Sequence, residues 1–140
     1  MTTDHQEEWH RRRRHAVTVH ATAQERLRAA EVTQARALVA DFARRARERD
    51  LPAEQLMARA YSGRGRYRTG LRGWYLKSDR SMAVGEDGEF YLLAVPASLR
   101  ARVAGVTLRP DDPPLVVGRG GRDGESIPLV TLLERALNGE

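Results

Sequence analysis

The sequence predicts an α+β fold, because helix-like and strand-like patterns of apolar residues occupy different parts of the chain. Apolar side chains recur at helical spacing over residues 22–49 and again over residues 126–137. Between these stretches, residues 74–95 alternate in the manner of β-strands and are interrupted by turn residues. We therefore expect a long N-terminal helix plus a short helix, then a small antiparallel β-meander, then a strand-loop-helix C-terminus.

The chain has 140 residues, enough for one domain preceded by a tail. Residues 1–15 contain few apolar groups and include four consecutive arginines at positions 11–14, which repel one another and are strongly hydrated. We expect residues 1–15 to form a disordered basic tail and residues 16–140 to form a single α+β domain. We interpret the arginine run as a solvated flank, with nucleic-acid contact as the alternative.

A capping box of Thr22 and Glu25 predicts that the long helix begins near residue 22, and its apolar stripe continues to Arg49. At 1.5 Å per residue such a helix is about 40 Å long, which exceeds the core of a small domain. Its stripe is rich in alanine, which lets two helices approach closely. We therefore predict a homodimer that forms through the long helix. Sustained a/d heptads are absent, so we expect no long coiled coil.

The short second helix is expected after Asp50, which is a suitable cap, with Pro52 in its first turn. Its inward-facing residues would be Leu56, Met57 and Ala60. The meander that follows has expected strands at residues 74–77, 81–84 and 89–95. The Asp87-Gly88 pair between the last two is a strong hairpin signal.

Beyond the meander we expect a helical turn over residues 98–104 and a fourth strand over residues 106–108. Three prolines make residues 109–114 an irregular exposed loop, because proline lacks the amide donor that regular structure needs. Residues 115–117 are expected to form a buried strand. Ser126 is expected to cap the last helix, which ends just before Gly139 and has clean helical spacing at Leu129, Leu132, Leu133, Ala136 and Leu137.

The strongest functional signal is the segment of residues 61–80, which holds four of the eight aromatic residues and six cations against one carboxylate. Guanidinium groups pair with phosphates and aromatic faces stack on bases, so this combination favours a nucleic-acid partner. The alternative is that the arginines only keep a loop soluble while the rings belong to the core. The candidate nucleic-acid-binding residues are Arg64, Arg66, Tyr67, Arg68, Arg72 and Trp74.

A second candidate site is the glycine-rich segment 118–126, which lies between an expected strand and an expected helix. Glycine lets backbone amides approach an anion, although the spacing fits neither a dinucleotide fingerprint nor a P-loop. Asp123 and Glu125 would also repel a phosphate, so we interpret the segment as a loop before a capped helix. The candidate anion contacts here are Arg119, Gly120, Gly121, Arg122 and Ser126.

Nothing in the sequence indicates a metal site or a cofactor. Without cysteine there is no thiolate zinc site, no disulfide and no cysteine nucleophile. The four histidines recur every five residues, at positions 5, 10, 15 and 20, which rotates each by about 140° on a helix and prevents a shared metal-binding face. The adjacent acids at 86–87 and 111–112 are typical of turns. We expect no metal and no cofactor, and we favour a protein that is not an enzyme.

The sequence contains no run of about 18 apolar residues, so we expect no membrane span. Its first residues lack the apolar run of a secretion signal, so we expect a cytoplasmic location. The leading hypothesis is a non-enzymatic nucleic-acid-binding protein, in a regulatory or accessory role, that acts mainly through phosphate contacts. The alternatives are a homo-oligomeric adaptor whose basic loop meets an acidic protein partner, and a small-anion or nucleotide sensor that uses residues 118–126.

Overall fold

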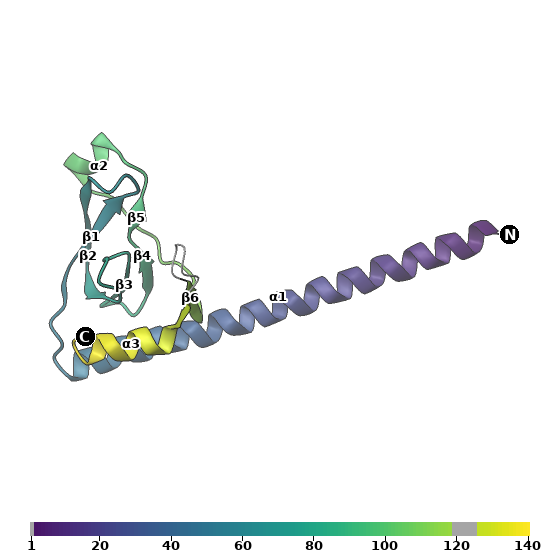
Figure 1. Cartoon of the computed structure of the whole chain (residues 1–140), viewed down its shortest axis with the longest axis horizontal. Helices are drawn as coiled ribbons and strands as arrows, with labels where there is room; N and C mark the ends of the chain where they lie inside the picture. The colour runs from purple at the N-terminus through teal and green to yellow at the C-terminus, as the bar shows by residue number, and fades with distance from the viewer. Residues whose placement is uncertain (1, 119–125) are drawn as a thin grey trace.

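The computed structural model describes residues 2–118 and 126–140, and it confirms the α+β fold (Figure 1). Helix α1, Thr2–Glu48, is followed by a five-stranded sheet, a two-stranded hairpin and a C-terminal helix. The barrel-like sheet sits at one end of α1, while the N-terminal part of α1 projects away from the other elements.

Helix α1 begins much earlier than expected, at Thr2, and so includes the residues predicted to form a disordered tail. The capping-box start is corrected: Thr22 lies inside the helix, and its hydroxyl donates to the carbonyl of Thr18 at 2.9 Å. The physical reason is composition, because the first 48 residues contain neither glycine nor proline and are rich in strong helix formers. An ion pair between Glu8 and Arg12, one turn apart, adds local support at 2.8 Å.

Only the C-terminal third of α1 packs against the rest of the chain. Residues 3–31 are exposed on every side of the helix. From Val32 onward one stripe is covered, with these residues fully buried: Ala35, Val39, Phe42, Ala43 and Ala46. The helix ends at Glu48, and Asp50 adopts a positive φ of 53° that turns the chain back toward the sheet.

The segment expected to form a short second helix is instead strand β1, Glu54–Ala60. Its buried residues, Leu56, Ala58 and Ala60, recur at every second position, which is the strand period. The cap signals at Asp50 and Pro52 follow the end of α1 and begin no new helix. Antiparallel pairing with the next strand decides the outcome over local propensity.

The remaining strands form a meander that closes on itself. Strands β2 (Arg66–Tyr75), β3 (Met82–Gly85) and β4 (Phe90–Leu92) pair antiparallel in sequence order, and β5 (Ala94–Val95) pairs parallel with β1. Only Leu93 separates β4 from β5; its amide donates to the carbonyl of Ser81 and its carbonyl accepts from Arg59. One bent segment therefore joins the two edges of the sheet into a small barrel.

Strand β2 starts eight residues earlier than predicted, so half of the basic segment of residues 61–80 is a strand and not a loop. Near its end, β2 crosses β3 very closely at Gly73, opposite Gly85. A Cβ atom at position 73 would lie 2.0 Å from the carbonyl oxygen of Val84, so only glycine fits there.

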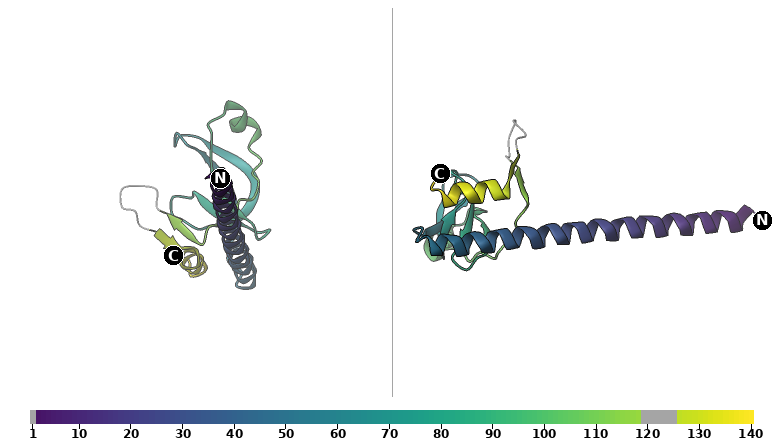
Figure 2. Two further views of the ribbon diagram at one scale, coloured as in Figure 1. Left: turned by 90° about the vertical axis from the view of Figure 1, so that its right-hand side faces the viewer. Right: turned by 90° about the horizontal axis from the view of Figure 1, so that it is seen from below.

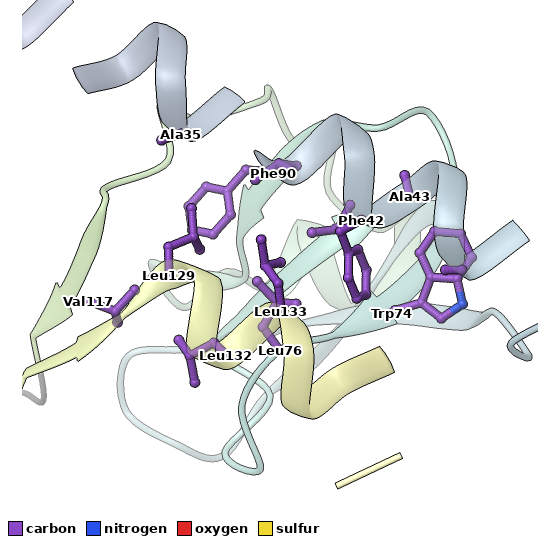
Figure 3. Packing of buried hydrophobic residues seen from close by; sticks show 13 residues of the cluster. Ala35, Phe42, Ala43, Trp74, Leu76, Phe90, Val117, Leu129, Leu132 and Leu133 are labelled. Atoms are coloured by element: carbon purple, nitrogen blue, oxygen red, sulfur yellow. The ribbon is translucent and has the colours of Figure 1, made fainter. Parts of the chain in front are cut away.

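The strand alternation separates two layers of core. Tyr75, Ala83 and Tyr91 face the inside of the barrel, while Trp74, Val84 and Phe90 face α1 and the C-terminal helix. Figure 3 shows Phe42 of α1 beside Trp74 and Leu133 beside Leu76 in this outer layer.

The C-terminal part follows the prediction with three corrections. The first is that the strand expected to be buried, β6 (Val116–Gly118), has only Val117 buried, while Val116 is 53% exposed. Helix α2, Leu99–Ala104, is capped by Ser98, which confirms the expected helical turn, and residues 109–114 are irregular as expected. Residues 106–108, however, form no strand.

Strands β6 (Val116–Gly118) and β7 (Ser126–Pro128) form a hairpin that leads into helix α3, Leu129–Leu137. Ser126 belongs to β7 and is not a helix cap. The N-cap is Pro128, whose fixed φ of −58° suits the end of a strand, and the amide of Leu129 donates to the carbonyl of Leu115. Helix α3 lies along the packed part of α1 (Figure 2).

Candidate nucleic-acid interface

The end of the barrel that carries α2 lies away from α1 (Figure 1), and the β1–β2 turn meets α2 there. Arginines of both segments gather at this end. We call this end the basic tip and define it by six exposed arginines: Arg59, Arg64, Arg66, Arg68, Arg100 and Arg102. Neither residues 55–78 nor residues 90–110, which supply the tip, contain a single Asp or Glu. The tip therefore carries a concentrated positive charge with no carboxylate of its own.

Hydrogen bonds from both ends of the α2 segment to β2 bring residues 98–106 next to residues 67–68. The amide of Ser98 donates to the Tyr67 hydroxyl at 3.0 Å, and the amide of Val106 donates to the carbonyl of Arg68 at 2.8 Å. Because of this packing, the arginines at positions 100 and 102 join those of the basic segment.

Three of the four predicted arginines belong to the basic tip. Arg64 and Arg66 have no carboxylate partner within residues 2–118 and 126–140, and Arg68 donates only to the carbonyl of Val103 at 3.2 Å. Arg66 also lies directly opposite Arg59 in the β1–β2 register. Two like charges facing each other across strands repel, and an anion bound between them would relieve this repulsion.

Arg72 lies apart from the other three predicted arginines. Its Nε atom pairs with Glu86 at 3.3 Å and its Nη2 atom donates to the carbonyl of Ala53 at 2.9 Å. The Glu86 carbonyl also accepts from Arg47 of α1, so Arg72 is at the helix-covered end of the barrel. Its charge is already partly neutralised.

The two rings predicted to stack on bases are core residues, which corrects that part of the hypothesis. Tyr67 is 2% exposed and its hydroxyl is engaged with Ser98. Trp74 is 5% exposed, donates from Nε1 to the carbonyl of Leu51 at 3.0 Å and packs edge-on against Phe42. Neither ring face is open to a base.

The aromatic residue that the tip does present is Tyr61, which is 72% exposed. It begins the β1–β2 turn, in which Gly63 adopts a φ of 81° and donates to the carbonyl of Ala60. Tyr61 belongs to the basic segment but is not among the six residues predicted to bind nucleic acid. The sequence contains a signal for its exposure, because Gly63 and Gly65 predict a turn directly after Tyr61 and turns lie at the surface.

The tip also exposes two aliphatic side chains on α2, Leu99 at 80% and Val103 at 79%. They are four residues apart and therefore share one face of the short helix. This apolar face adjoins the arginines and adds contact area for a partner.

The glycine-rich segment adds little to the site. Arg119, Gly120, Gly121 and Arg122 lie outside the described residues, as does most of that segment. Ser126 is exposed and pairs with Gly118 in the β6–β7 hairpin.

The acids that the sequence placed in turns have structural partners. Asp87 accepts from the Tyr91 hydroxyl at 2.6 Å and from the Glu89 amide at 2.9 Å. Burial, aided by the bond to Asp87, raises the pKa of Tyr91 far above its usual range.

Asp79, next to the basic tip, also has a shifted pKa. Burial alone would raise it, but the hydrogen bonds from Ser81 and the charges of Lys77 and Arg59 lower it overall. Asp79 is thus held ionised at the edge of the tip.

A scan of family models and searches of curated proteins and solved structures each found no match to this chain. Among the helices described, none combines the length and apolar character needed to cross a membrane. Within the described residues, no three His, Asp or Glu side chains gather to hold a metal ion. The inference to function therefore depends on the charges and exposed side chains of the basic tip.

Proposed function

We propose that the protein binds nucleic acid through the basic tip, mainly by contacts to phosphates. The observation that carries the proposal is the collection of six exposed arginines supplied by two segments without any carboxylate. Arginine is suited to phosphate because its planar fork donates two parallel hydrogen bonds. Such contacts carry little sequence information, so binding is expected to be largely independent of sequence.

Tyr61 gives a reason to favour single strands. An exposed ring beside cations can stack on an unpaired base, whereas the bases of a duplex are already stacked on one another. The proposal places this activity in the cytoplasm, in a regulatory or accessory role without catalysis.

The test is a fluorescence-polarisation titration of labelled single-stranded and duplex oligonucleotides at several salt concentrations. We expect dissociation constants of about 1–100 μM near physiological salt, tightening steeply as salt is lowered. The absence of binding at low salt would contradict the proposal. Binding of poly-glutamate in that case would support the rival interpretation, an acidic protein partner.

A second proposal concerns helix α1: we propose that its exposed part pairs with a second copy of the chain. Trp9, Val17, Val19 and Leu27 lie in that part and are each more than half exposed. A single helix of this kind gains no stability from packing, and isolated helices are marginal in water.

One feature of α1 matches pairing between helices. A tryptophan and four alanines recur at intervals of exactly seven residues, and all five are exposed: Trp9, Ala16, Ala23, Ala30 and Ala37. Seven residues is the period at which two supercoiled helices meet, and alanine allows close approach of their axes.

Sedimentation equilibrium of the full chain tests the pairing. Ala23→Glu places a charge in the repeat and is expected to weaken the dimer at least tenfold. Ala21→Glu is the matched control, because position 21 is rotated by about 160° around the helix from position 23. A monomer in the unsubstituted chain, or an equal effect of both substitutions, would contradict the pairing.

A further inference from the structure

A small cavity opens at the basic tip between the β1–β2 turn and the start of α2. Its volume is about 230 Å³, and its polar lining residues are Ser62, Arg64, Tyr67, Ser98 and Arg102. The lining contains no Asp or Glu. The other lining residues, Ala60, Gly65, Ala97 and Leu99, are apolar, so every charged group of the lining is a cation and every other polar side chain is a hydroxyl.

The hydroxyl groups of the cavity have protons left to donate. The Tyr67 hydroxyl accepts from the Ser98 amide, and within the described residues its own proton has no acceptor. The Ser98 hydroxyl accepts from the Ala101 amide at 3.2 Å, which leaves its proton free in the same way. Guanidinium groups are donors only.

Glycine at position 65 leaves room for the Tyr67 hydroxyl. A Cβ atom at Gly65 would lie 2.7 Å from the Tyr67 hydroxyl oxygen and 3.0 Å from its Cζ atom. The lack of a side chain at position 65 therefore gives the hydroxyl the space it occupies in the cavity wall. Since Tyr67 is 2% exposed, this donor is held rigidly.

We infer that the cavity binds a phosphomonoester, namely the terminal phosphate of a nucleic-acid strand. A phosphomonoester is close to a dianion at neutral pH and has three acceptor oxygens, which matches two guanidinium groups and several hydroxyl donors. The volume is below the 300–1,000 Å³ typical of pockets that enclose whole small molecules, so it suits a single phosphate and not a complete nucleotide.

This inference rests on the proposed function and deepens it, since the same tip would hold the strand beyond its end. An internal phosphodiester carries one negative charge and has two free oxygens, so it offers these donors less charge and fewer acceptors than a terminal phosphate does. Arg66, which does not line the cavity, would contact the strand without reading its end.

The test compares short single strands that carry a 5′-phosphate, a 3′-phosphate or only hydroxyl ends, by fluorescence polarisation. We expect at least one phosphorylated end to bind about tenfold tighter, the scale of one added charge-assisted hydrogen bond. Tyr67→Phe should remove this preference and keep the affinity for strands with hydroxyl ends. Arg102→Gln should also remove the preference and, because it takes away a tip arginine, should lower the affinity for all strands as well.

Two matched controls separate the cavity from general charge and from fold. Arg66→Gln should lower the affinity for all strands equally and keep the preference. Tyr91→Phe, which removes a hydroxyl far from the cavity, should change nothing. Arg102 is exposed, so the inference stays testable even if Tyr67→Phe proves unstable.

Equal binding of all strands would overturn the terminal-phosphate inference and leave the proposed function standing. If no strand binds at low salt, the proposed function fails, and calorimetry with methyl phosphate and inorganic phosphate tests the cavity alone. Millimolar binding that Tyr67→Phe abolishes would support a phosphate site, occupied by free phosphate and not by a strand end. No binding of either would overturn the inference.

Discussion

The two ends of the barrel use arginine in opposite ways. At the end covered by α1, arginines pair with carboxylates of the same chain: Arg36 with Asp112, Arg44 with Asp41 and Glu48, Arg45 with Asp41, and Arg72 with Glu86. At the basic tip, the six arginines have no such partner within the described residues, although Arg59 and Arg68 donate to carbonyl oxygens. The number of arginines alone therefore does not identify an anion-binding surface. The presence or absence of nearby carboxylates distinguishes a neutralised surface from a candidate anion-binding surface.

The paired arginines contribute little to folding, because exposed ion pairs are worth about 0–1 kcal/mol each. Their consequence is that carboxylates of the same chain neutralise these particular arginines. The tip keeps its charge, including the opposed pair Arg59 and Arg66, and so retains a repulsion that an anionic partner would relieve.

The largest expected difference between the two ends is in stability. Phe42→Ala removes a fully buried ring that packs on Trp74 and should lower the free energy of unfolding by about 3–5 kcal/mol. Leu99→Ala at the tip removes an exposed side chain and should change it by less than about 0.5 kcal/mol. Urea denaturation measures both, and similar losses would show that the tip is part of the core.

The next effect is on binding and concerns the exposed rings. Tyr61→Ala should weaken single-strand binding by about 1–3 kcal/mol and duplex binding by less, since only unpaired bases can stack. Trp9→Ala, which removes an exposed ring on α1, is the control and should leave polarisation titrations unchanged. Equal loss for single strands and duplexes would exclude stacking by Tyr61.

The smallest expected effect is on stability and concerns Asp79, which lies at the edge of the tip. Its pKa is lowered on folding, so the stability it contributes is present above its unfolded pKa of about 3.9 and is lost as pH falls through the folded value. Asp79→Asn should lower the free energy of unfolding by less than about 1 kcal/mol at pH 6, because the carboxylate is half exposed. At pH 3 the loss should be smaller still. Ser81→Ala should likewise reduce the loss of unfolding free energy that urea denaturation measures as the pH is lowered. If both substitutions lower the free energy of unfolding equally at every pH, the lowered pKa of Asp79 is contradicted.

The sequence was sufficient to predict the fold class, the last helix and the location of the charge. It failed where the outcome depends on pairing between segments. Tyr61 and Tyr67 lie in the same basic segment, but Tyr67 occupies an inward position of β2 whereas Tyr61 lies in the turn before it. The prediction of a short helix after Asp50 was wrong for the same reason, because residues 54–60 pair with β2 as a strand.

The contribution of α2 to the candidate site could not be predicted at all. Arg100 and Arg102 are more than thirty residues from Arg64 and Arg66, and they join the tip through the bond between Ser98 and Tyr67. No local pattern encodes that contact. Residues 1–15 show a different conflict between signals: their charge density predicts disorder, while the absence of glycine and proline allows the continuous helix Thr2–Glu48.

The most direct test of the central claim compares two variants with the same change in net charge. One replaces Arg64, Arg66, Arg100 and Arg102 of the tip with glutamine, and the other replaces the paired Arg36, Arg44, Arg45 and Arg72. In polarisation titrations of single strands, the tip variant should lose about 100-fold in affinity at low salt. Its slope of log K against log salt should fall in magnitude by about 3. The affinity of the paired variant should stay within about threefold of that of the unsubstituted chain. Equal losses in the two variants would contradict the account, because binding would then follow net charge and not the unpaired arginines of the tip.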